Sequence, residues 1–217
     1  MAKPRAILFD LDGTLRDTKD LIYDAVLYTL KLHGTVLTRK DIEPYIHHHS
    51  VVYQQFLSHV PWDEFDAVYK KKLHELWDEV ALFPHALDTI QSLSSEGYRL
   101  AIVTSATQEG TETFLRTKGL AKFFESISGV RPGVEPKPAP DLVLDALNNL
   151  ALPPEDTIMI GDMVADVEAA RAAGVVCVGV TYGFADKDEL VKAGAVHIVN
   201  SLTELQPYLE KLKINQE

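Results

Sequence analysis

From Pro84 onward, the chain alternates short apolar runs with amphipathic stretches, a rhythm typical of βα units around a parallel sheet. One more apolar run, Ala6–Phe9, comes before all of these and is typical of a strand buried on both faces. We therefore expect an α/β fold with a doubly wound, mainly parallel sheet. The other expected strands span residues 99–104, 124–128, 157–160, 175–180 and 197–199. The expected helices of this part span residues 86–95, 108–118, 141–150, 164–173, 187–193 and 202–212.

The segment that follows the first strand has only helical periodicity. Residues 17–33 place their apolar side chains on one helical face, and Thr38, with an acidic residue three positions later, is typical of a second helix start. Another amphipathic stretch runs from Phe65 to Val80, and Pro84 stops it. We expect its aromatic residues to form a small core. The predicted organisation is a core domain of residues 1–16 and 84–217 and an inserted all-helical domain of residues 17–83.

Charge and composition limit the possible partners. The 32 acidic and 21 basic residues give a net charge of −11, which repels nucleic acid. No apolar run approaches the roughly 20 residues needed to cross a bilayer. The single cysteine, Cys177, lies among valines and indicates a buried thiol in a reducing compartment. We therefore expect a cytoplasmic protein without nucleic-acid or membrane partners, either a monomer or a weak homodimer.

Chemically active side chains follow several of the expected strands. In an open parallel sheet, the working groups gather beyond the carboxyl ends of the strands. The residues at or near such positions are four carboxylates, a hydroxyl pair and a lysine: Asp10, Asp12, Asp162, Asp166, Thr104, Ser105 and Lys137.

Crowded carboxylates raise one another's pKa, so a cation must lie between them. Because the set holds hard oxygen ligands and neither cysteine nor histidine, it points to Mg²⁺, which prefers carboxylates, water and substrate phosphate. Lys137 supplies a second positive charge suited to a phosphoryl oxygen. Thr104, Ser105 and backbone N–H groups near Leu11 and Asp12 are candidates for holding the other phosphate oxygens.

A pair of carboxylates two residues apart suits a two-step phosphoryl transfer. One carboxylate attacks phosphorus, and the second protonates the leaving oxygen and later deprotonates water. This pattern predicts hydrolysis through an aspartyl-phosphate. Milder interpretations remain open for single residues, because Asp162 also suits a helix N-cap and the Thr104–Ser105 pair suits a cap on the 108–118 helix.

The chain resembles the haloacid dehalogenase (HAD) superfamily, in its phosphatase branch with a helical cap. The similarity spans nearly the whole chain and implies a Rossmann-like core. The four motifs that carry it occur in order: Asp10-Leu11-Asp12-Gly13-Thr14, Thr104-Ser105, Lys137-Pro138, and Gly161-Asp162 through Asp166.

The resemblance also implies a role for each motif residue. Asp10 would be the nucleophile and a metal ligand, and Asp12 the general acid and base whose backbone carbonyl also binds Mg²⁺. Thr104 would bind phosphate, and Lys137 would hold both phosphate and nucleophile. The remaining two acidic residues would complete the metal site, Asp162 as a direct ligand and Asp166 as a nearby support.

The sequence departs from the family pattern at three places. Met163 stands where relatives often carry Ser, Thr or Asn, and Arg16 stands at a usually apolar position. In the cap, Ile46-His47-His48-His49-Ser50 replaces a stretch that often contains glycine, and a polar cap surface is expected there. The segment Gly179–Gly183 is similar to the phosphoglycolate phosphatase-like branch. The chain as a whole resembles the phosphoglycolate phosphatase and beta-phosphoglucomutase-like members of the superfamily.

The predicted activity is Mg²⁺-dependent hydrolysis of small phosphorylated metabolites. A phosphomutase of the beta-phosphoglucomutase type would use the same groups, but it needs cap cations for a second phosphate, chiefly Lys19 and Lys31. A hydrolytic dehalogenase has no use for the crowded carboxylates. Outside enzymology, a phospho-acceptor or binding protein is the alternative, because a doubly wound sheet with an early Asp also describes receiver domains.

Overall fold

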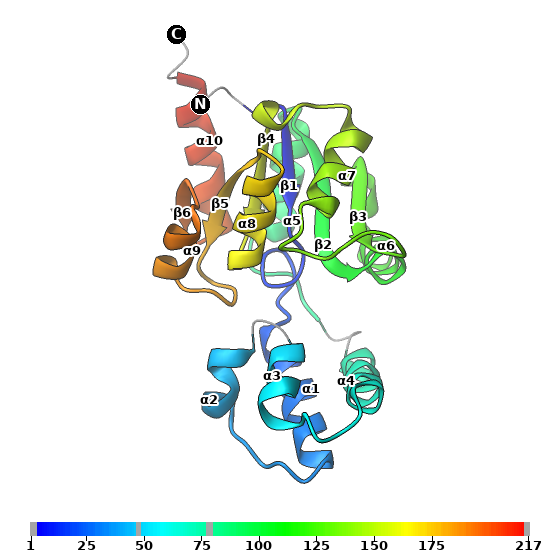
Figure 1. Ribbon diagram of the computed structural model, residues 1–217. Coiled ribbons are helices and arrows are strands. Elements are labelled where there is room, and N and C mark those ends of the chain that lie inside the picture. The colour runs from blue at the N-terminus through cyan, green and yellow to red at the C-terminus, as the bar shows by residue number, and fades with distance from the viewer. Residues whose placement is uncertain (1–3, 47–48, 77–79, 215–217) are drawn as a thin grey trace. The chain divides into compact units, whose positions relative to one another are not determined.

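The chain divides into two compact units, which the computed structural model describes at residues 4–46, 49–76 and 80–214 (Figure 1). The first unit consists of residues 1–16 and 82–217, and the second of residues 17–81. The second unit is therefore inserted in the chain between the first strand of the sheet and all the later ones.

The first unit contains a six-stranded sheet in which every neighbouring pair of strands is parallel. The strand order is β3-β2-β1-β4-β5-β6, so the chain winds outward in both directions from the centre. This arrangement confirms the doubly wound α/β fold. The strands are β1 (Ala6–Phe9), β2 (Arg99–Thr107), β3 (Ser126–Val130), β4 (Thr157–Gly161), β5 (Val176–Val180) and β6 (His197–Val199).

Helices cover both faces of the sheet. The strands of a parallel sheet are apolar on both faces, so both faces need such a cover. Alternate strand residues point to opposite faces: Ile7 and Phe9 contribute to one apolar cluster with α5, α6 and α10, whereas Ala6 and Leu8 contribute to the other with α7, α8 and α9. The helices of this unit are α5 (Ala86–Ser95), α6 (Gln108–Thr117), α7 (Asp141–Leu150), α8 (Val164–Ala172), α9 (Lys187–Ala193) and α10 (Leu205–Ile214).

The second unit is helical over its described residues. Phe65 is fully buried and contacts Tyr53 and Tyr69, with ring centroids 5.2 Å and 6.3 Å away, so part of the aromatic set forms the expected core. Trp62 also contacts the rings of Tyr53 and Phe65, with centroids 5.0 Å and 5.7 Å away, although 37% of its surface is exposed. The expectation is wrong for Tyr28, which is 46% exposed, and Trp77 lies outside the described residues. The α-helices are α1 (Lys19–Leu32), α2 (Arg39–Ile42), α3 (His49–Phe56) and α4 (Trp62–Leu76).

Several element ends differ from the sequence-based expectation. The predicted strand 124–128 lies instead at 126–130, because Phe124 closes a short 3-10 helix, Ala121–Phe123. The helix expected over 202–212 begins as a 3-10 turn, Leu202–Glu204, before α10. Val80 lies beyond the end of α4.

The histidine run of the second unit falls at a gap in the description. His47 and His48 lie outside the described residues, and the backbone of His49 begins α3. The expectation of a polar cap surface there therefore stays a prediction.

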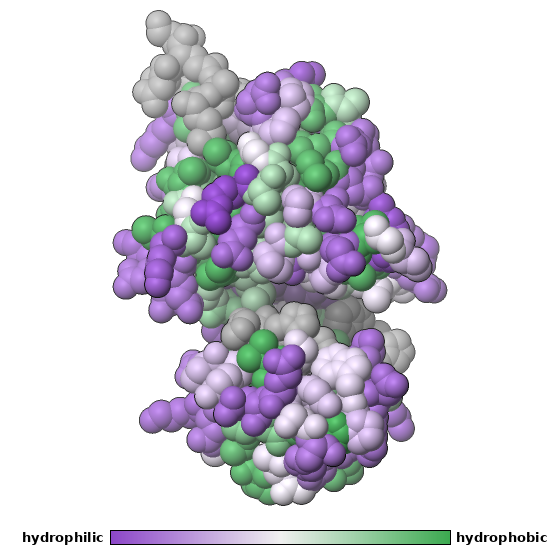
Figure 2. Space-filling model, viewed as in Figure 1, coloured by the Kyte–Doolittle hydropathy of each residue, from purple (hydrophilic) through white to green (hydrophobic). Residues whose placement is uncertain are grey.

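Polar side chains predominate on the face of the molecule drawn in Figure 2, and apolar ones occur between them in small groups. Over residues 4–46, 49–76 and 80–214, no helix combines the length and the apolar character needed to span a bilayer.

Candidate active site

The candidate site lies where the sheet winding reverses. β1 and β4 are neighbours at this point, and the chain leaves them in opposite directions, the arrangement in which α/β proteins usually bind ligands beyond the carboxyl ends of the strands. Asp10 follows β1 directly and its N–H donates to the carbonyl of Ile160 on β4 at 2.9 Å. Asp162 follows β4 directly. Strand pairing therefore brings two acidic residues together that are far apart in the sequence.

Three carboxylates meet at these strand ends. Asp10, Asp162 and Asp166 each offer an oxygen, and these oxygens all lie within 4.8 Å of one another. All three residues are buried, with at most 4% of their surface exposed. Asp166 joins from the first turn of α8, which starts just after the end of β4.

Lys137 connects two of these carboxylates. Its Nζ atom donates to Oδ1 of Asp10 and to Oδ1 of Asp166, both at 2.5 Å, and to the carbonyl of Val103 on β2 at 3.2 Å. The Lys137 side chain is only 5% exposed. The lysine therefore comes from a separate loop to the centre of the acidic group, as its place in the third motif suggested.

Burial and charge together shift the acidity of the cluster. Burial raises the pKa of Asp10 to about 7, although the Lys137 charge opposes this rise. Burial and the neighbouring carboxylates also raise the pKa of Asp162 well above its ordinary value. For Lys137, burial lowers the pKa, but attraction to Asp10 and Asp166 outweighs it and the net shift is upward.

The charge balance of the cluster matches a divalent cation. Three carboxylates against one ammonium leave two negative charges when all four groups are ionised. Carboxylate oxygens are the ligands that Mg²⁺ prefers, so the residues present fit such an ion.

Two glycines make room for Asp162. A Cβ atom on Gly13 would lie 2.3 Å from Oδ2 of Asp162, and one on Gly183 would lie 2.2 Å from the same oxygen. Gly13 also has φ +89°, a left-handed conformation that side chains disfavour. The first motif therefore needs glycine here both for its turn and for the close approach of the carboxylate.

Hydrogen bonds fix both oxygens of Asp162, and sequence reasoning had assigned none of their donors. The Thr14 hydroxyl donates to Oδ1 at 3.0 Å, and the Phe184 backbone N–H donates to Oδ2 at 2.8 Å. Tyr182 in turn donates its hydroxyl to the carbonyl of Thr14 at 2.8 Å. The signal for Thr14 was its place in the first motif. The Phe184 contact depends on the path of a loop, for which the sequence offered no signal.

Met163 takes part through its backbone. Its N–H donates to Oδ2 of Asp166 at 2.9 Å, so this carboxylate caps α8 while its other oxygen accepts from Lys137. The contact needs no side-chain donor at position 163. The alternative in which Asp162 is the N-cap of α8 is therefore wrong, because Met163 occupies the cap position.

The second motif lies within β2, which continues to Thr107. Thr104 is buried next to Val103, whose carbonyl accepts from Lys137, whereas Ser105 is exposed. Neither residue caps α6, because the Thr107 side chain accepts from the Gly110 N–H instead. The alternative in which Thr104 or Ser105 caps this helix is therefore wrong.

Asp12 lies apart from the three-carboxylate group. Its two carboxylate oxygens accept hydrogen bonds from Nε and Nη2 of Arg16, both at 2.7 Å. The structure thus brings together four of the candidate residues, Asp10, Asp162, Asp166 and Lys137. It gives the fourth acidic side chain, that of Asp12, a basic partner which sequence reasoning had not linked to it.

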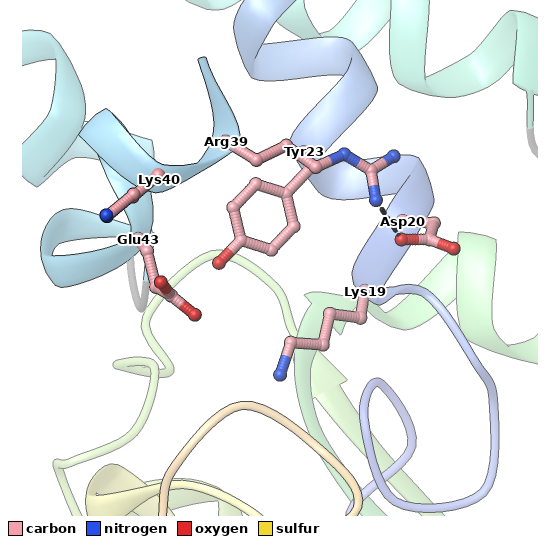
Figure 3. A pocket seen from close by; sticks show the side chains of 6 residues that line it. All are labelled: Lys19, Asp20, Tyr23, Arg39, Lys40 and Glu43. Atoms are coloured by element: carbon pink, nitrogen blue, oxygen red, sulfur yellow. Dashed lines mark hydrogen bonds and ion pairs between the residues drawn. The ribbon is translucent and has the colours of Figure 1, made fainter.

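A separate cavity of about 390 Å³ lies in the second unit (Figure 3). Arg39 forms ion pairs there with Asp20 and, at 2.6 Å, with Asp24. Three basic and two acidic side chains share the lining with one tyrosine, so the charges nearly balance. The lining residues are Lys19, Asp20, Tyr23, Arg39, Lys40 and Glu43.

Comparison with known proteins supports the resemblance. The chain is 35% identical to the pyrophosphatase PpaX of Bacillus velezensis over 181 residues, which cover 82% of this chain and 83% of that protein. A haloacid dehalogenase-like hydrolase from Streptococcus pneumoniae matches with a TM-score of 0.83 and 28% identity, over 96% of this chain and 99% of that one.

A third similar protein has been solved with a ligand. CbbY from Rhodobacter sphaeroides, in complex with xylulose-(1,5)bisphosphate, matches with a TM-score of 0.77 and 28% identity, over 93% of this chain and 96% of that one. The family model for haloacid dehalogenase-like hydrolases matches residues 7–180, which include all four motifs. The chain therefore belongs to the haloacid dehalogenase-like hydrolase family.

Proposed function

We propose that this protein is a Mg²⁺-dependent phosphatase that hydrolyses small phosphate monoesters through an aspartyl-phosphate on Asp10. The observation that carries this proposal is the meeting of three buried carboxylates with the buried Lys137 amine at the carboxyl ends of β1 and β4. Membership of the hydrolase family and the names of similar proteins support phosphatase activity.

In the proposed first step, an oxygen of Asp10 attacks phosphorus and the bond from phosphorus to the ester oxygen breaks. Asp12 donates a proton to the departing oxygen, so that an alcohol leaves. In the second step, water attacks phosphorus and gives a proton to Asp12, while the bond from phosphorus to Asp10 breaks. The products are an alcohol and inorganic phosphate, and both carboxyl groups return to their starting states.

Other residues bind and orient the phosphate group in this proposal. Lys137 holds a phosphoryl oxygen as well as Asp10, and Thr104, Ser105 and backbone N–H groups bind the remaining oxygens. The residues proposed to hold Mg²⁺ are Asp10, Asp162, Asp166 and the backbone carbonyl of Asp12. When bound there, the ion supplies charge stabilisation for the transferred phosphoryl group.

Inorganic pyrophosphate is a second candidate substrate. Several similar proteins carry the name pyrophosphatase PpaX, among them those of Bacillus velezensis, Bacillus mycoides and Listeria monocytogenes. In pyrophosphate, the leaving group is a phosphate instead of an alcohol, and the groups described above suit both reactions.

The mutase alternative finds modest support. A putative beta-phosphoglucomutase from Thermotoga maritima matches with a TM-score of 0.75 and 25% identity. The cavity of the second unit contains Lys19, but Asp20 and Glu43 share its lining and oppose the binding of a second phosphate. Following the product formed from a hexose 1-phosphate separates the two reactions, because a mutase yields an isomer and a phosphatase yields free phosphate.

The decisive experiment screens phosphorylated metabolites, including phosphoglycolate, sugar phosphates, nucleotides and pyrophosphate, with and without EDTA. We expect phosphate release that EDTA abolishes and added Mg²⁺ restores. Metal-independent turnover contradicts the proposal. Binding of beryllium fluoride without turnover of any ester favours the phospho-acceptor alternative instead.

We also propose that residues 17–83 act as a cap domain over the reaction. Its two connections to the rest of the chain run side by side, because Arg16 and Leu82 form a β-bridge and the Phe83 N–H donates to the Leu15 carbonyl at 2.9 Å. Paired short connections allow a domain to move as a body about a few backbone torsions. The protein is further proposed to work in the cytoplasm as a monomer or weak homodimer, which size-exclusion chromatography at several concentrations tests.

A further inference from the structure

Arg16 is an unusual side chain for its surroundings. It has no exposed surface and is among the largest fully buried side chains of the chain, although arginine is seldom buried without a partner. Its guanidinium carbon lies 4.5 Å from the ring centroid of Phe114 on α6. Phe114 itself belongs to the apolar cluster that covers one face of the sheet. The arginine therefore packs against the buried core of the first unit.

From this buried position, the Arg16 guanidinium donates hydrogen bonds to both carboxylate oxygens of Asp12. Nε donates to Oδ1 and Nη2 donates to Oδ2, each at 2.7 Å. A two-point contact of this kind fixes the direction and the plane of a carboxylate, which a single contact does not. The Arg16 side chain is fully buried whereas 23% of the Asp12 side chain is exposed, so the arginine leaves an edge of Asp12 accessible.

The backbone supports the same arrangement. The Gly13 N–H donates to the Arg16 carbonyl at 2.9 Å, and the Arg16 N–H donates to the Leu11 carbonyl at 2.8 Å. These bonds close a tight loop in which Asp12 and Arg16 stand next to each other. The carboxylates of Asp10 and Asp162 belong to the cation-binding group, and the Asp12 carboxylate lies outside it.

We propose that Arg16 is the positioning residue for Asp12: its buried guanidinium holds the Asp12 carboxylate in one orientation and keeps it out of the cation-binding group, in place to take a proton from the attacking water. This inference rests on the proposed phosphatase function, in which Asp12 exchanges protons with the leaving oxygen and with water. An apolar side chain at position 16 leaves Asp12 without this fixed partner. The alternative is a buried ion pair whose contribution is to folding alone.

A double-mutant cycle separates these two roles. The variants are Arg16→Met, Asp12→Asn and the double variant, assayed with an alkyl phosphate that the wild-type protein hydrolyses. We expect Asp12→Asn to lower kcat by about 10²- to 10⁴-fold, and Arg16→Met to lower it about 10- to 100-fold with little change in KM. Because Arg16 acts through Asp12, the double variant should be no slower than Asp12→Asn.

Two outcomes of the cycle overturn the inference. In one, Arg16→Met multiplies the loss caused by Asp12→Asn, as a general weakening of the fold would. In the other, Arg16→Met keeps kcat within about twofold of the wild type. A twofold change corresponds to only about 0.4 kcal/mol of activation free energy, too little for a positioning role. The matched control is Arg99→Met. It breaks the Arg99–Glu125 ion pair at the amino end of β2, away from the candidate site at the carboxyl ends, and should leave kcat unchanged.

A milder variant covers the case in which Arg16→Met does not fold. Arg16→Lys keeps the positive charge but loses the two-point contact, so its kcat should fall between those of the wild type and Arg16→Met. Wild-type kcat in a folded Arg16→Lys variant overturns the inference, because the charge alone would then suffice.

A structural measurement keeps this inference separate from the proposed function. Crystal structures of the wild type and of an Arg16 variant should show the Asp12 carboxylate in one place in the former and displaced in the latter. An undisplaced carboxylate overturns the positioning role whatever the activity. Full activity of Asp10→Asn, by contrast, overturns the proposed reaction while leaving the Asp12 measurement intact.

Discussion

At Asp10, burial raises the pKa of the carboxyl group and the positive charge of Lys137 lowers it, and the net shift affects how stability depends on pH. Its pKa rises from an ordinary 3.8 to about 7 in the folded protein. Between these two values, the unfolded chain releases a proton that the folded protein still holds, so a rise in pH favours unfolding. Asp162 shifts in the same direction. Without metal, these carboxyl groups should therefore stabilise the folded protein most below about pH 4, and the melting temperature should fall as the pH rises from there toward 7.

Differential scanning fluorimetry in EDTA checks this pH dependence. The matched variant is Asp10→Asn, which keeps the size of the side chain and removes its charge. Its melting temperature should fall less between pH 5 and pH 7.5 than that of the wild type, with each 1 kcal/mol worth about 2 to 4 °C in a protein of this size. Identical pH dependence in the two proteins contradicts the proposed burial of an ionisable Asp10.

The same substitution tests the proposed nucleophile. Asp10→Asn should lower kcat at least about 10³-fold, because an amide oxygen does not form the covalent intermediate. Circular dichroism should show a folded protein. An active variant, after exclusion of contaminating phosphatase by a second purification, contradicts the assignment of Asp10.

Single residues also mark the limit of what the sequence reveals. Asp10, Asp162 and Lys137 were predictable because each follows an expected strand or belongs to a motif of the resembled family. The Asp12–Arg16 pair was not predictable. Arginine at a position that is usually apolar in the family stands out in the sequence, but nothing there indicates which carboxylate it contacts. The donor from Phe184 is a backbone group, and every residue except proline carries one.

At the scale of elements, the turn after β1 depends on Gly13. Alanine there adds a Cβ atom 2.3 Å from Asp162 at a φ of +89°. We expect Gly13→Ala to displace the Asp162 carboxylate, to lower kcat by at least about tenfold and to raise the Mg²⁺ concentration needed for activity.

The matched control for this prediction is Gly119→Ala. Gly119 also has a positive φ, +69°, but an added Cβ would meet nothing within 4 Å. Both variants should lose roughly 1 kcal/mol of stability from the backbone conformation, whereas only Gly13→Ala should lose activity. Steady-state kinetics over a Mg²⁺ series measures the difference. Equal loss of kcat in both variants contradicts a specific role for the Gly13 contact.

Element types were easier to predict than element ends. The helices expected over 141–150 and 187–193 are confirmed at both ends, because their amphipathic patterns are strong and polar or cap residues bound them. β2 extends three residues beyond the predicted Thr104, since Thr107 still pairs with Val130 of β3. Pairing between strands decides such ends, and local sequence does not encode it.

At the scale of the whole molecule, the division into two units makes a prediction about ligand effects. Mg²⁺ alone should slow amide hydrogen exchange around Asp10 and Asp162 in the first unit, and leave α1 and α4 of the second unit unchanged. Adding beryllium fluoride should extend protection to the connections near residues 15–18 and 81–84, if the helical unit acts as a cap.

Hydrogen exchange with mass spectrometry resolves these segments. The control is Asp10→Asn, which should lose the response to beryllium fluoride because the fluoride adduct forms on an aspartate. Unchanged exchange at both connections with the fluoride adduct in place contradicts the cap proposal. Protection by Mg²⁺ confined to α1 and α4 contradicts the proposed metal site.

The overall architecture was predictable because two independent patterns agreed. The alternation after Pro84 predicted a parallel sheet, and the family resemblance implied the same sheet with an insertion after β1. The order β3-β2-β1-β4-β5-β6 confirms this. What the sequence did not reveal is which aromatic residues of the second unit are buried, because Phe65 and Trp62 lie one turn apart on the same helix with very different exposure.

The discontinuous first unit also affects how the protein folds during synthesis. β1 occupies the centre of the sheet, yet Ala6 pairs with Arg99 on one side and Thr157 on the other. The ribosome therefore releases the central strand long before either neighbour exists, while residues 17–81 can form their local helical contacts at once. Until β4 has emerged, the backbone N–H and C=O groups along the edges of β1 and the apolar side chains on its faces lack their native partners. This interval is when the nascent chain depends most on protection from aggregation.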